Sequence, residues 1–166
     1  MNKKVELITA SQLNIVRDLA YDIWPDVYSE MITTEQIDFM LEMMYNQDTL
    51  RRDVERGVQF YVLSTDEQPV GFFAIEPNTP TPEVMRLHKL YLKKSFHGSG
   101  LGKFMLDNIE LNTKAQGLQK INLNVNRNNP TVLIYKKQGY TIVMSEYITI
   151  GDGYFMEYYL MEKVFY

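Results

Sequence analysis

A glycine-rich segment stands at a point where the chain passes from a predicted strand to a predicted helix. Three of the nine glycines lie within five residues, at Gly98, Gly100 and Gly102. Glycine lets the backbone turn sharply with no Cβ in the way, so successive N–H groups can face an anion. The dipole of the following helix adds positive potential at its N-terminus. The chemistry that this segment indicates is the binding of phosphate groups.

Two phosphate-binding patterns do not fit this segment. The dinucleotide fingerprint needs G-x-G-x-x-G in a parallel βαβ unit, with an acidic residue about 20 residues further on. The Walker A loop needs G-x-x-x-x-G-K-S/T, which the chain lacks. The pattern that fits is R/Q-x-x-G-x-G/A, with His97, Gly100 and Gly102 at its defined positions.

A second pattern lies downstream of the first. The form N-x-x-A-x-x-x-Y-x-x-x-G-F/Y is matched by Asn128, Thr131, Tyr135, Gly139 and Tyr140. Either pattern alone is weak, whereas the two at this separation and on the expected elements are specific. With both, the chain resembles the GNAT N-acetyltransferase superfamily in the order of all its elements, most strongly over residues 83–140. Within that superfamily it is similar to the bacterial PaiA-type spermidine/spermine N-acetyltransferases.

The resemblance implies acetyl-CoA as cosubstrate and no metal. The implied cofactor-binding residues are Leu90, Tyr91, Leu92, His97, Gly98, Ser99, Gly100, Leu101, Gly102, Lys103, Asn128 and Tyr135. Amides of residues 97–103 would bind the pyrophosphate. Leu90 and Leu92 would pair with the pantetheine arm as an added strand does. Asn128 would contact the pantetheine or hold the loop beside it.

Two residues carry the implied catalysis. Tyr135 would lie near the thioester sulfur and protonate the leaving thiolate, a role that suits a phenol. His88 stands where many members have a glutamate that deprotonates the amine through water, and a neutral imidazole can do the same near pH 7. Whether His88 or water takes this proton stays open. His97 replaces the usual Arg or Gln, so its phosphate contact is expected to be weaker or pH-dependent.

Each of these residues also has a purely structural interpretation. Tyr135 could pack in the core beside its neighbours on a helix. His88 could be a hydrogen-bonded polar residue between the sheet and a helix. Asn128 and Asn129 could cap the helix that follows them, which asparagine does well without any ligand.

The acceptor is expected to be a primary amine that binds to the front half of the chain. An aromatic and acidic lip for a small cationic amine, such as a polyamine, could be formed by Trp24, Tyr28, Glu30 and Met31. One alternative is a catalytically weak acyl-CoA-binding sensor module. Another is an enzyme of the same fold that acetylates a protein N-terminus or an antibiotic.

The periodicity of apolar residues predicts the elements that position these groups. Strands are predicted at residues 5–8, 58–64, 70–76, 83–92, 121–125, 140–144 and 154–164. Helices are predicted after capping patterns at Thr9 and Thr33, at residues 48–56 and 100–116, and from residue 130 to near 139. The methionines of the second helix, Met40, Met43 and Met44, are interpreted as adaptable core.

The strand at residues 83–92 is predicted to alternate strictly between two faces. One face is expected to carry Val84, Arg86, His88, Leu90 and Leu92. The other is expected to carry Met85, Leu87, Lys89 and Tyr91.

Together the elements predict a mixed α+β chain, α/β in the broad sense. The resemblance implies a GNAT-like three-layer fold, with a central mixed, splayed, mostly antiparallel sheet and helices on both sides. No repeat, low-complexity segment or linker interrupts the pattern. We therefore expect a single domain over residues 1–166.

Composition narrows the classes of function further. The 166 residues include no cysteine, which excludes thiol nucleophiles and cysteine-based metal sites. A formal charge of −4 without a long basic run disfavours nucleic acid as a partner. No signal peptide or membrane span is recognised, so we expect a cytoplasmic protein without a membrane partner. A homodimer is left open.

Overall fold

One seven-stranded sheet forms the centre of the protein, described here for residues 1–165 of a computed structural model. Its strands follow the order β1-β2-β3-β4-β5-β7-β6. They are β1 (Lys3–Leu7), β2 (Gln59–Thr65), β3 (Gln68–Pro77), β4 (Val84–Leu92), β5 (Lys120–Asn126), β6 (Thr141–Gly151) and β7 (Tyr154–Val164). Neighbouring strands are antiparallel except β4 and β5, which run parallel. The predicted mixed, mostly antiparallel sheet is confirmed.

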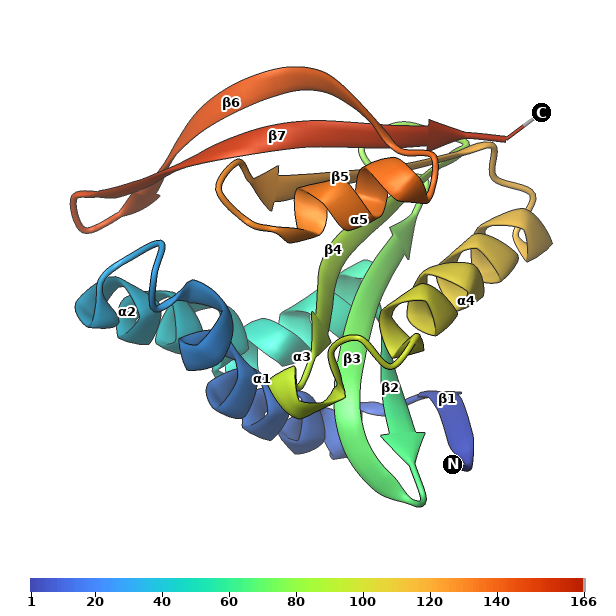
Figure 1. Ribbon diagram of the computed structural model, residues 1–166, viewed down its shortest axis with the longest axis horizontal. Helices are drawn as coiled ribbons and strands as arrows, with labels where there is room; N and C mark the ends of the chain where they lie inside the picture. Colours follow the sequence, from blue (N-terminus) through green and yellow to red (C-terminus); the bar gives the residue numbers. More distant parts are fainter. Residues whose placement is uncertain (166) are drawn as a thin grey trace.

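Helices cover both faces of this sheet (Figure 1). One face packs against α1 (Leu13–Tyr28), α2 (Thr34–Tyr45) and α3 (Gln47–Arg56). The other packs against α4 (Leu101–Ala115) and α5 (Thr131–Lys137). Two short 3-10 helices, η1 (Ala10–Gln12) and η2 (Lys94–Phe96), precede α1 and α4. Within residues 1–165, none of the helices has the length and apolar character needed to cross a membrane.

The helix boundaries follow the capping residues of the sequence. Thr33 Oγ1 accepts a hydrogen bond from the Gln36 amide at 3.1 Å, as the predicted start of α2 requires. Gln12 Oε1 accepts from the Thr9 amide at 2.9 Å, so the first pattern begins η1, which leads directly into α1. Gly57, with a φ of 120°, ends α3 in a conformation that other residues rarely adopt.

Helix α1 continues through a proline, and strand β6 extends further than its pattern indicates. Helix α1 passes through Pro25 to Tyr28, because Trp24 and Tyr28 lie four residues apart and both pack into the core. The Ser29 amide donates to the Pro25 carbonyl at 3.1 Å and completes this last turn. Strand β6 continues well beyond residue 144, because β7 pairs with it along almost its whole length.

A β-bulge in β4 makes the predicted strict alternation wrong. Ala74 of β3 pairs with Lys89, whereas the next residue, Ile75, pairs with Leu87, so His88 is an extra residue without a partner. The bulge shifts the alternation by one position. Met85 and Leu87 consequently share the α4 face with Leu90 and Leu92. Tyr91 instead packs against the cluster on the α1 face, and Lys89 faces Tyr45 and Phe60 of that same cluster.

Candidate functional site

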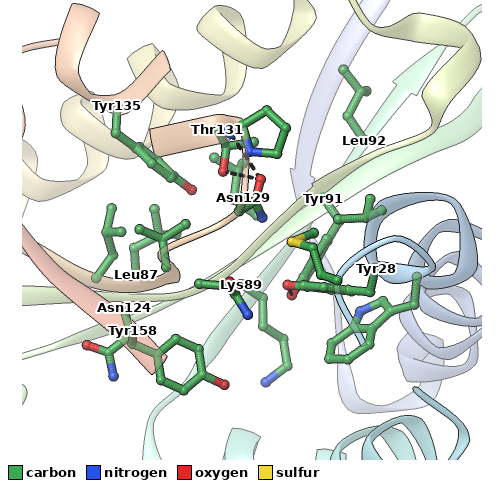
Figure 2. A pocket seen from close by; sticks show the side chains of 18 of the residues that line it. Tyr28, Leu87, Lys89, Tyr91, Leu92, Asn124, Asn129, Thr131, Tyr135 and Tyr158 are labelled. Atoms are coloured by element: carbon green, nitrogen blue, oxygen red, sulfur yellow. Dashed lines mark hydrogen bonds between the residues drawn. The ribbon is translucent and has the colours of Figure 1, made fainter. Parts of the chain in front are cut away.

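The two parallel strands at the centre of the sheet separate along their length. Pairing between β4 and β5 covers four residues of each strand and ends at Leu87 and Leu123. Beyond this point β4 continues beside β3 to Leu92, and β5 continues beside β7 to Asn126. A cavity of about 910 Å³ fills the space between and around the separated strands. The predicted splayed sheet is thus confirmed, and Figure 2 shows the side chains at this opening.

The glycine-rich segment, residues 97–103, is called the phosphate loop below. Gly98 and Gly100 have φ values of 78° and 85°, in the left-handed region that favours glycine. Gly100 directly precedes α4. At Gly98, Gly100 and Gly102, no heavy atom lies within 4 Å of the position that a Cβ would take. The loop therefore leaves open space beside its backbone, which a ligand group could occupy.

The backbone amides of this loop lack acceptors. The first hydrogen bond of α4 joins the Phe104 amide to the Gly100 carbonyl at 3.1 Å. Within residues 1–165, no hydrogen-bond acceptor is found for the amides of residues 98–103. Unpaired amides at a helix N-terminus favour an anion through both hydrogen bonding and the helix dipole. This arrangement fits the pyrophosphate of acetyl-CoA.

Side chains of the phosphate loop are largely engaged elsewhere. His97 Nε2 donates to the Leu92 carbonyl at 2.9 Å, so the imidazole ties the loop to the end of β4. Lys103 Nζ forms an exposed ion pair with Asp107 at 2.8 Å. The Ser99 hydroxyl donates to the Phe96 carbonyl. The groups left for an anion are consequently the main-chain amides.

The free edge of β4 supplies further backbone groups. The Lys93 amide donates to the Val70 carbonyl of the β3 side at 2.9 Å. Because alternate residues of an antiparallel strand direct their backbone groups to opposite neighbours, Leu90 and Leu92 direct theirs away from β3, toward the cavity. The Leu92 carbonyl is taken by His97, which leaves the Leu90 amide and carbonyl and the Leu92 amide.

Tyr135 of α5 directs its hydroxyl into the cavity (Figure 2). The residue is buried, and its ring packs edge-on against Tyr140 with 5.5 Å between ring centres. Burial raises the pKa of the Tyr135 phenol, with a smaller contribution from Tyr28 in the same direction. The hydroxyl therefore keeps its proton throughout the neutral range.

The two asparagines before α5 have separate positions. Asn129 Oδ1 accepts from the Thr131 amide at 3.0 Å and from the Thr131 hydroxyl at 2.8 Å, which caps the start of the helix. Asn128 is exposed and lines the cavity. The structural interpretation therefore applies to Asn129, whereas the side chain of Asn128 is left available to a ligand.

His88, the bulged residue, binds a carboxylate. Its Nε2 lies 2.8 Å from Glu76 Oε1, and Arg56 approaches the same oxygen at 3.5 Å. Burial lowers the pKa of His88, against the hydrogen bond to Glu76, which raises it. Burial alone would raise the pKa of Glu76, but His88 and Arg56 bring it below its ordinary value. A neutral imidazole that donates Nε2–H to a carboxylate keeps Nδ1 as a proton acceptor.

The remaining part of the cavity is called the acceptor compartment. It is walled by α1, α2, the α1-facing side of β4 and the β6–β7 hairpin, whose contributing residues include Ile150, Met156 and Tyr158. The predicted lip residues Trp24, Tyr28, Glu30 and Met31 all line the cavity. Trp24, at 1% exposed, lies beneath its neighbours in the wall and not at an edge. The Tyr28 and Tyr91 hydroxyls are hydrogen-bonded at 2.9 Å and join α1 to β4.

Most of the predicted site residues line the cavity, but four do not. Those that line it are His88, Leu90, Tyr91, Leu92, His97, Gly98, Gly102, Asn128 and Tyr135. Those that do not are Ser99, Gly100, Leu101 and Lys103. Among residues 1–165, no group of three or more acidic or histidine side chains is arranged to hold a metal ion.

Several residues of the cavity are not identified by sequence reasoning. Lys89 lines the cavity but lies in a strand that also carries Arg86 and His88, so its charge alone does not single it out. Glu76 does not line the cavity, but it contacts the cavity residue His88, and its charge directly after the apolar residues 70–75 is a signal that could have identified it. Tyr158 carries no such signal. Of the methionines interpreted as core, Met40 is buried, but Met43 is 39% exposed, so for Met43 that interpretation is wrong. All three methionines line the cavity.

The chain is similar in sequence to known acetyltransferases. The family model for the acetyltransferase (GNAT) domain matches residues 28–154. The chain is 22% identical over 163 residues to the spermidine N(1)-acetyltransferase of Thermoplasma acidophilum, covering 95% of this chain and 97% of that protein. It is also 22% identical over 157 residues to an uncharacterized N-acetyltransferase of Lactobacillus delbrueckii subsp. lactis, covering 89% of this chain and 91% of that one.

Solved structures show the same fold. The crystal structure of the PaiA N-acetyltransferase of Thermoplasma acidophilum in complex with coenzyme A has a TM-score of 0.83 and 22% identity. The match covers 99% of this chain and 100% of the PaiA chain. A GCN5-related N-acetyltransferase of Rhodopseudomonas palustris has a TM-score of 0.83 and 13% identity, over 99% of this chain and 96% of that chain.

Proposed function

Because the chain belongs to the GNAT acetyltransferase family, we propose that it transfers an acetyl group from acetyl-CoA directly to a primary amine. The observation that carries this proposal is the combination of a splayed β4–β5 pair with the unpaired amides of the phosphate loop. The loop would take the pyrophosphate. The free backbone groups of Leu90 and Leu92 would bind the pantetheine arm as they would bind a neighbouring strand.

Acetyl-CoA supplies an activated acyl group, so the new C–N bond to the acceptor forms as the C–S bond breaks. Tyr135 would donate its phenolic proton toward the sulfur, because its raised pKa keeps it protonated in the neutral range. A strand amide near Leu92 would donate to the carbonyl oxygen as negative charge develops there. The chain contains no cysteine, so no acyl-enzyme on sulfur can form.

His88 is proposed to accept the amine proton at Nδ1, directly or through water. Glu76 is proposed as a positioning residue, because its carboxylate accepts the Nε2 proton at 2.8 Å and so selects the tautomer. The lowered pKa of His88 supports this role, since the base must be neutral before it can take a proton.

The acceptor proposed from the sequence is a small cationic amine, such as a polyamine. Asp26 and Glu30, two exposed carboxylates, line the cavity at the end of α1 and could bind a distal ammonium there. The name of the Thermoplasma acidophilum relative supports the same class of acceptor.

A thermal-shift titration with acetyl-CoA, with ADP and NAD as controls, tests the cosubstrate. A ligand that binds only the folded state adds about 2.7 kcal/mol at 100 times its Kd, which should raise Tm by roughly 5 to 11 °C. Release of CoA with spermidine, putrescine and butylamine then tests turnover. Absence of a shift at millimolar acetyl-CoA would reject the proposal.

A sensor that binds acetyl-CoA without turnover is the alternative from another class. It predicts a full thermal shift but no acetylated product with any amine of a broad panel. An acetyltransferase for peptides would instead show product with an N-terminal peptide and none with small amines.

A further inference from the structure

Lys89 is a buried cation to which the proposed mechanism gives no role. It follows the bulged His88 on β4, lines the cavity and is only 9% exposed. The bulge turns it to the α1 side of the sheet, where its ammonium lies between the cavity and the buried rings of Tyr45 and Phe60. A lysine this deeply buried is rare in proteins unless it is paired.

No carboxylate of the described chain forms a direct ion pair with Lys89. Within residues 1–165, none lies within 4.0 Å of its ammonium. Asp53, the acid whose charge acts on it, is paired with Arg56 at 3.6 Å. Glu76 is held by His88 and Arg56. The ring centres of Tyr45 and Phe60 lie 5.4 and 5.9 Å from Lys89 Nζ, and such cation–π contacts compensate only part of the lost hydration.

The surroundings of Lys89 differ from those of the cavity mouth. Figure 2 shows the Lys89 ammonium and the Tyr158 hydroxyl directed toward the same part of the pocket. The walls nearby include the apolar side chains of Met40, Met44 and Met156. This inner end therefore offers hydrogen-bond donors on an apolar background, whereas Asp26 and Glu30 at the mouth offer acceptors.

We propose that Lys89 anchors an anion subsite and that the enzyme acetylates amines that also carry a carboxylate. The carboxylate would bind the Lys89 ammonium, with the Tyr158 hydroxyl as a second donor once it turns from the Met156 sulfur, to which it donates at 3.2 Å. A short apolar spacer would lie along the methionine side chains. The inference rests on the proposed acetyl transfer and adds a second class of acceptor to it.

Burial decides which charge the compartment favours. At equal separation, two charges interact about fourfold more strongly near a partly buried site than in bulk water. Lys89 is buried, whereas Asp26 and Glu30 are exposed. A carboxylate is therefore held at the inner end, while the second ammonium of a diamine is repelled from it and stays at the mouth. Burial lowers the pKa of Lys89, against the charge of Asp53, and a bound carboxylate would raise it again.

The reaction on such an acceptor is the same acetyl transfer. The amine nitrogen forms a C–N bond to the acetyl carbon, the C–S bond breaks, one amine proton goes to the base, and the thiolate takes a proton. The carboxylate takes no part in bond formation. Its contribution is expected in KM for the acceptor and not in kcat.

Matched acceptors separate the effect of charge from that of length. Butylamine, γ-aminobutyrate and putrescine share a four-carbon chain with a neutral, anionic or cationic end. Hexylamine, ε-aminocaproate and hexamethylenediamine form the corresponding six-carbon set. In at least one set the wild type is expected to acetylate the amino acid with a kcat/KM about tenfold or more above that of the neutral amine, as a charge-assisted hydrogen bond gives.

The Lys89→Met variant should abolish this preference while leaving kcat for the neutral amine within about twofold at a pH above the acid limb. The comparison is made there because the charge of Lys89 lowers the pKa of His88, which its removal would raise. Exchange of a buried unpaired charge for an apolar side chain is not expected to destabilise the fold, and unfolding curves check this. Lys114→Met is the matched control. Lys114 is exposed, lies 4.9 Å from the ring centre of Phe165 and does not line the cavity, so its removal should leave the preference intact.

Two further measurements test the subsite. Inhibition of the wild type tests it if the variant does not fold, and a binding measurement tests it if no amine is acetylated. Caproate and butyrate should inhibit acetylation of hexylamine competitively with the amine. Calorimetric titration with ε-aminocaproate in the presence of CoA should give binding that Lys89→Met weakens about tenfold or more.

The outcomes distinguish the subsite from the proposed function. Binding of the amino acids without acetylation of any amine would reject the proposed function and retain the subsite. Acetylation with no dependence of the preference on residue 89 would reject the subsite alone. A uniform loss of kcat for all acceptors in Lys89→Met would instead make Lys89 part of the proton transfer and overturn its assignment as an anion anchor.

Discussion

The phosphate loop and the acceptor compartment open into one cavity but are built from different parts of the chain. The loop is a continuous segment, residues 97–103, and presents main-chain amides. The compartment is assembled from side chains of α1, α2, β4 and the β6–β7 hairpin, which are far apart in the sequence. A site made of backbone leaves a local signature of glycines. A site made of distant side chains leaves none.

The difference has a chemical cause. A pyrophosphate presents the same charge and oxygen atoms in every acyl-CoA, so generic amide donors are sufficient for it. An acceptor amine differs from its competitors in length, charge and apolar surface, and discrimination among these needs side chains. We therefore expect substitutions in the loop to change binding of the cosubstrate, and substitutions in the compartment to change acceptor choice or pH dependence.

Tyr135→Phe should give the largest effect, because Tyr135 lies where the two regions meet. Loss of the proposed proton donor is expected to lower kcat by about a hundredfold. The Kd for acetyl-CoA should stay within about twofold of wild type, since the phenyl ring remains. Steady-state kinetics and a calorimetric titration measure the two quantities.

Tyr140→Phe is the matched control for this variant. The Tyr140 hydroxyl is buried, finds no hydrogen-bond partner among the described residues, and belongs to the ring that packs against Tyr135. Its removal should leave kcat nearly unchanged. Equal losses of turnover and acetyl-CoA affinity in Tyr135→Phe would assign Tyr135 to packing or binding.

Gly102→Val should raise the Kd for acetyl-CoA by about tenfold or more, since a side chain would occupy the open space beside the amides. Gly102 suits this test because its φ lies outside the left-handed region, so valine adds no such backbone strain. Gly102→Ala should give a smaller change in the same direction. An unchanged affinity in Gly102→Val would make the loop structural and remove the contrast between the two regions.

Glu76→Gln should lower kcat by about tenfold and shift the pH profile. The hydrogen bond to the Glu76 carboxylate and the charge of that carboxylate both raise the pKa of His88, so a neutral amide in its place lowers that pKa further. The acid limb, where activity falls as His88 becomes protonated, should therefore move to lower pH. His88→Ala should remove this limb. A pH–rate profile of kcat/KM measures both.

The control for the pH experiment is Glu157→Gln. Glu157 pairs with Arg127 at 2.8 Å on the surface, and both side chains are about half exposed. Its exchange should move neither limb. An unshifted profile in both Glu76→Gln and His88→Ala would leave water as the base.

Asn129→Ala should give the smallest of these effects and act on stability. Loss of the cap at the start of α5 is expected to cost about 1 kcal/mol, which corresponds to a Tm lower by about 2 to 4 °C. Asn128→Ala, beside it, should leave Tm unchanged and weaken acetyl-CoA binding. If Asn128→Ala lowered Tm and Asn129→Ala weakened acetyl-CoA binding, the proposed roles of the two asparagines would be reversed.

Sequence patterns were sufficient for the order of elements and for the class of fold. Capping at Thr33, the glycines of the phosphate loop and the periodicity of α4 are local signals, and local sequence determines them. The Asn128 and Tyr135 pattern is likewise confined to one strand–helix unit.

The features that could not be predicted depend on contacts between residues far apart in the sequence. Pro25 lies within a helix because Trp24 and Tyr28 find a common core, which only tertiary packing reveals. Met43 has core-like spacing yet is 39% exposed and lines the cavity, which its position on the helix alone does not reveal. Glu76 becomes meaningful only when β3 brings it beside His88.

The bulge at His88 lets β4 carry one additional residue without a change in the walls of the cavity. Because His88 is the extra residue between Leu87 and Lys89, its deletion would give regular pairing with β3 and leave both neighbours on the faces that they now occupy. A strand that kept His88 but paired it regularly with β3 would instead exchange the faces of Leu90 and Leu92 with those of Lys89 and Tyr91. The lysine would then enter the cluster beneath α4, and two leucines would face the acceptor. The bulge therefore separates the position of the histidine from the alternation of the residues that follow it.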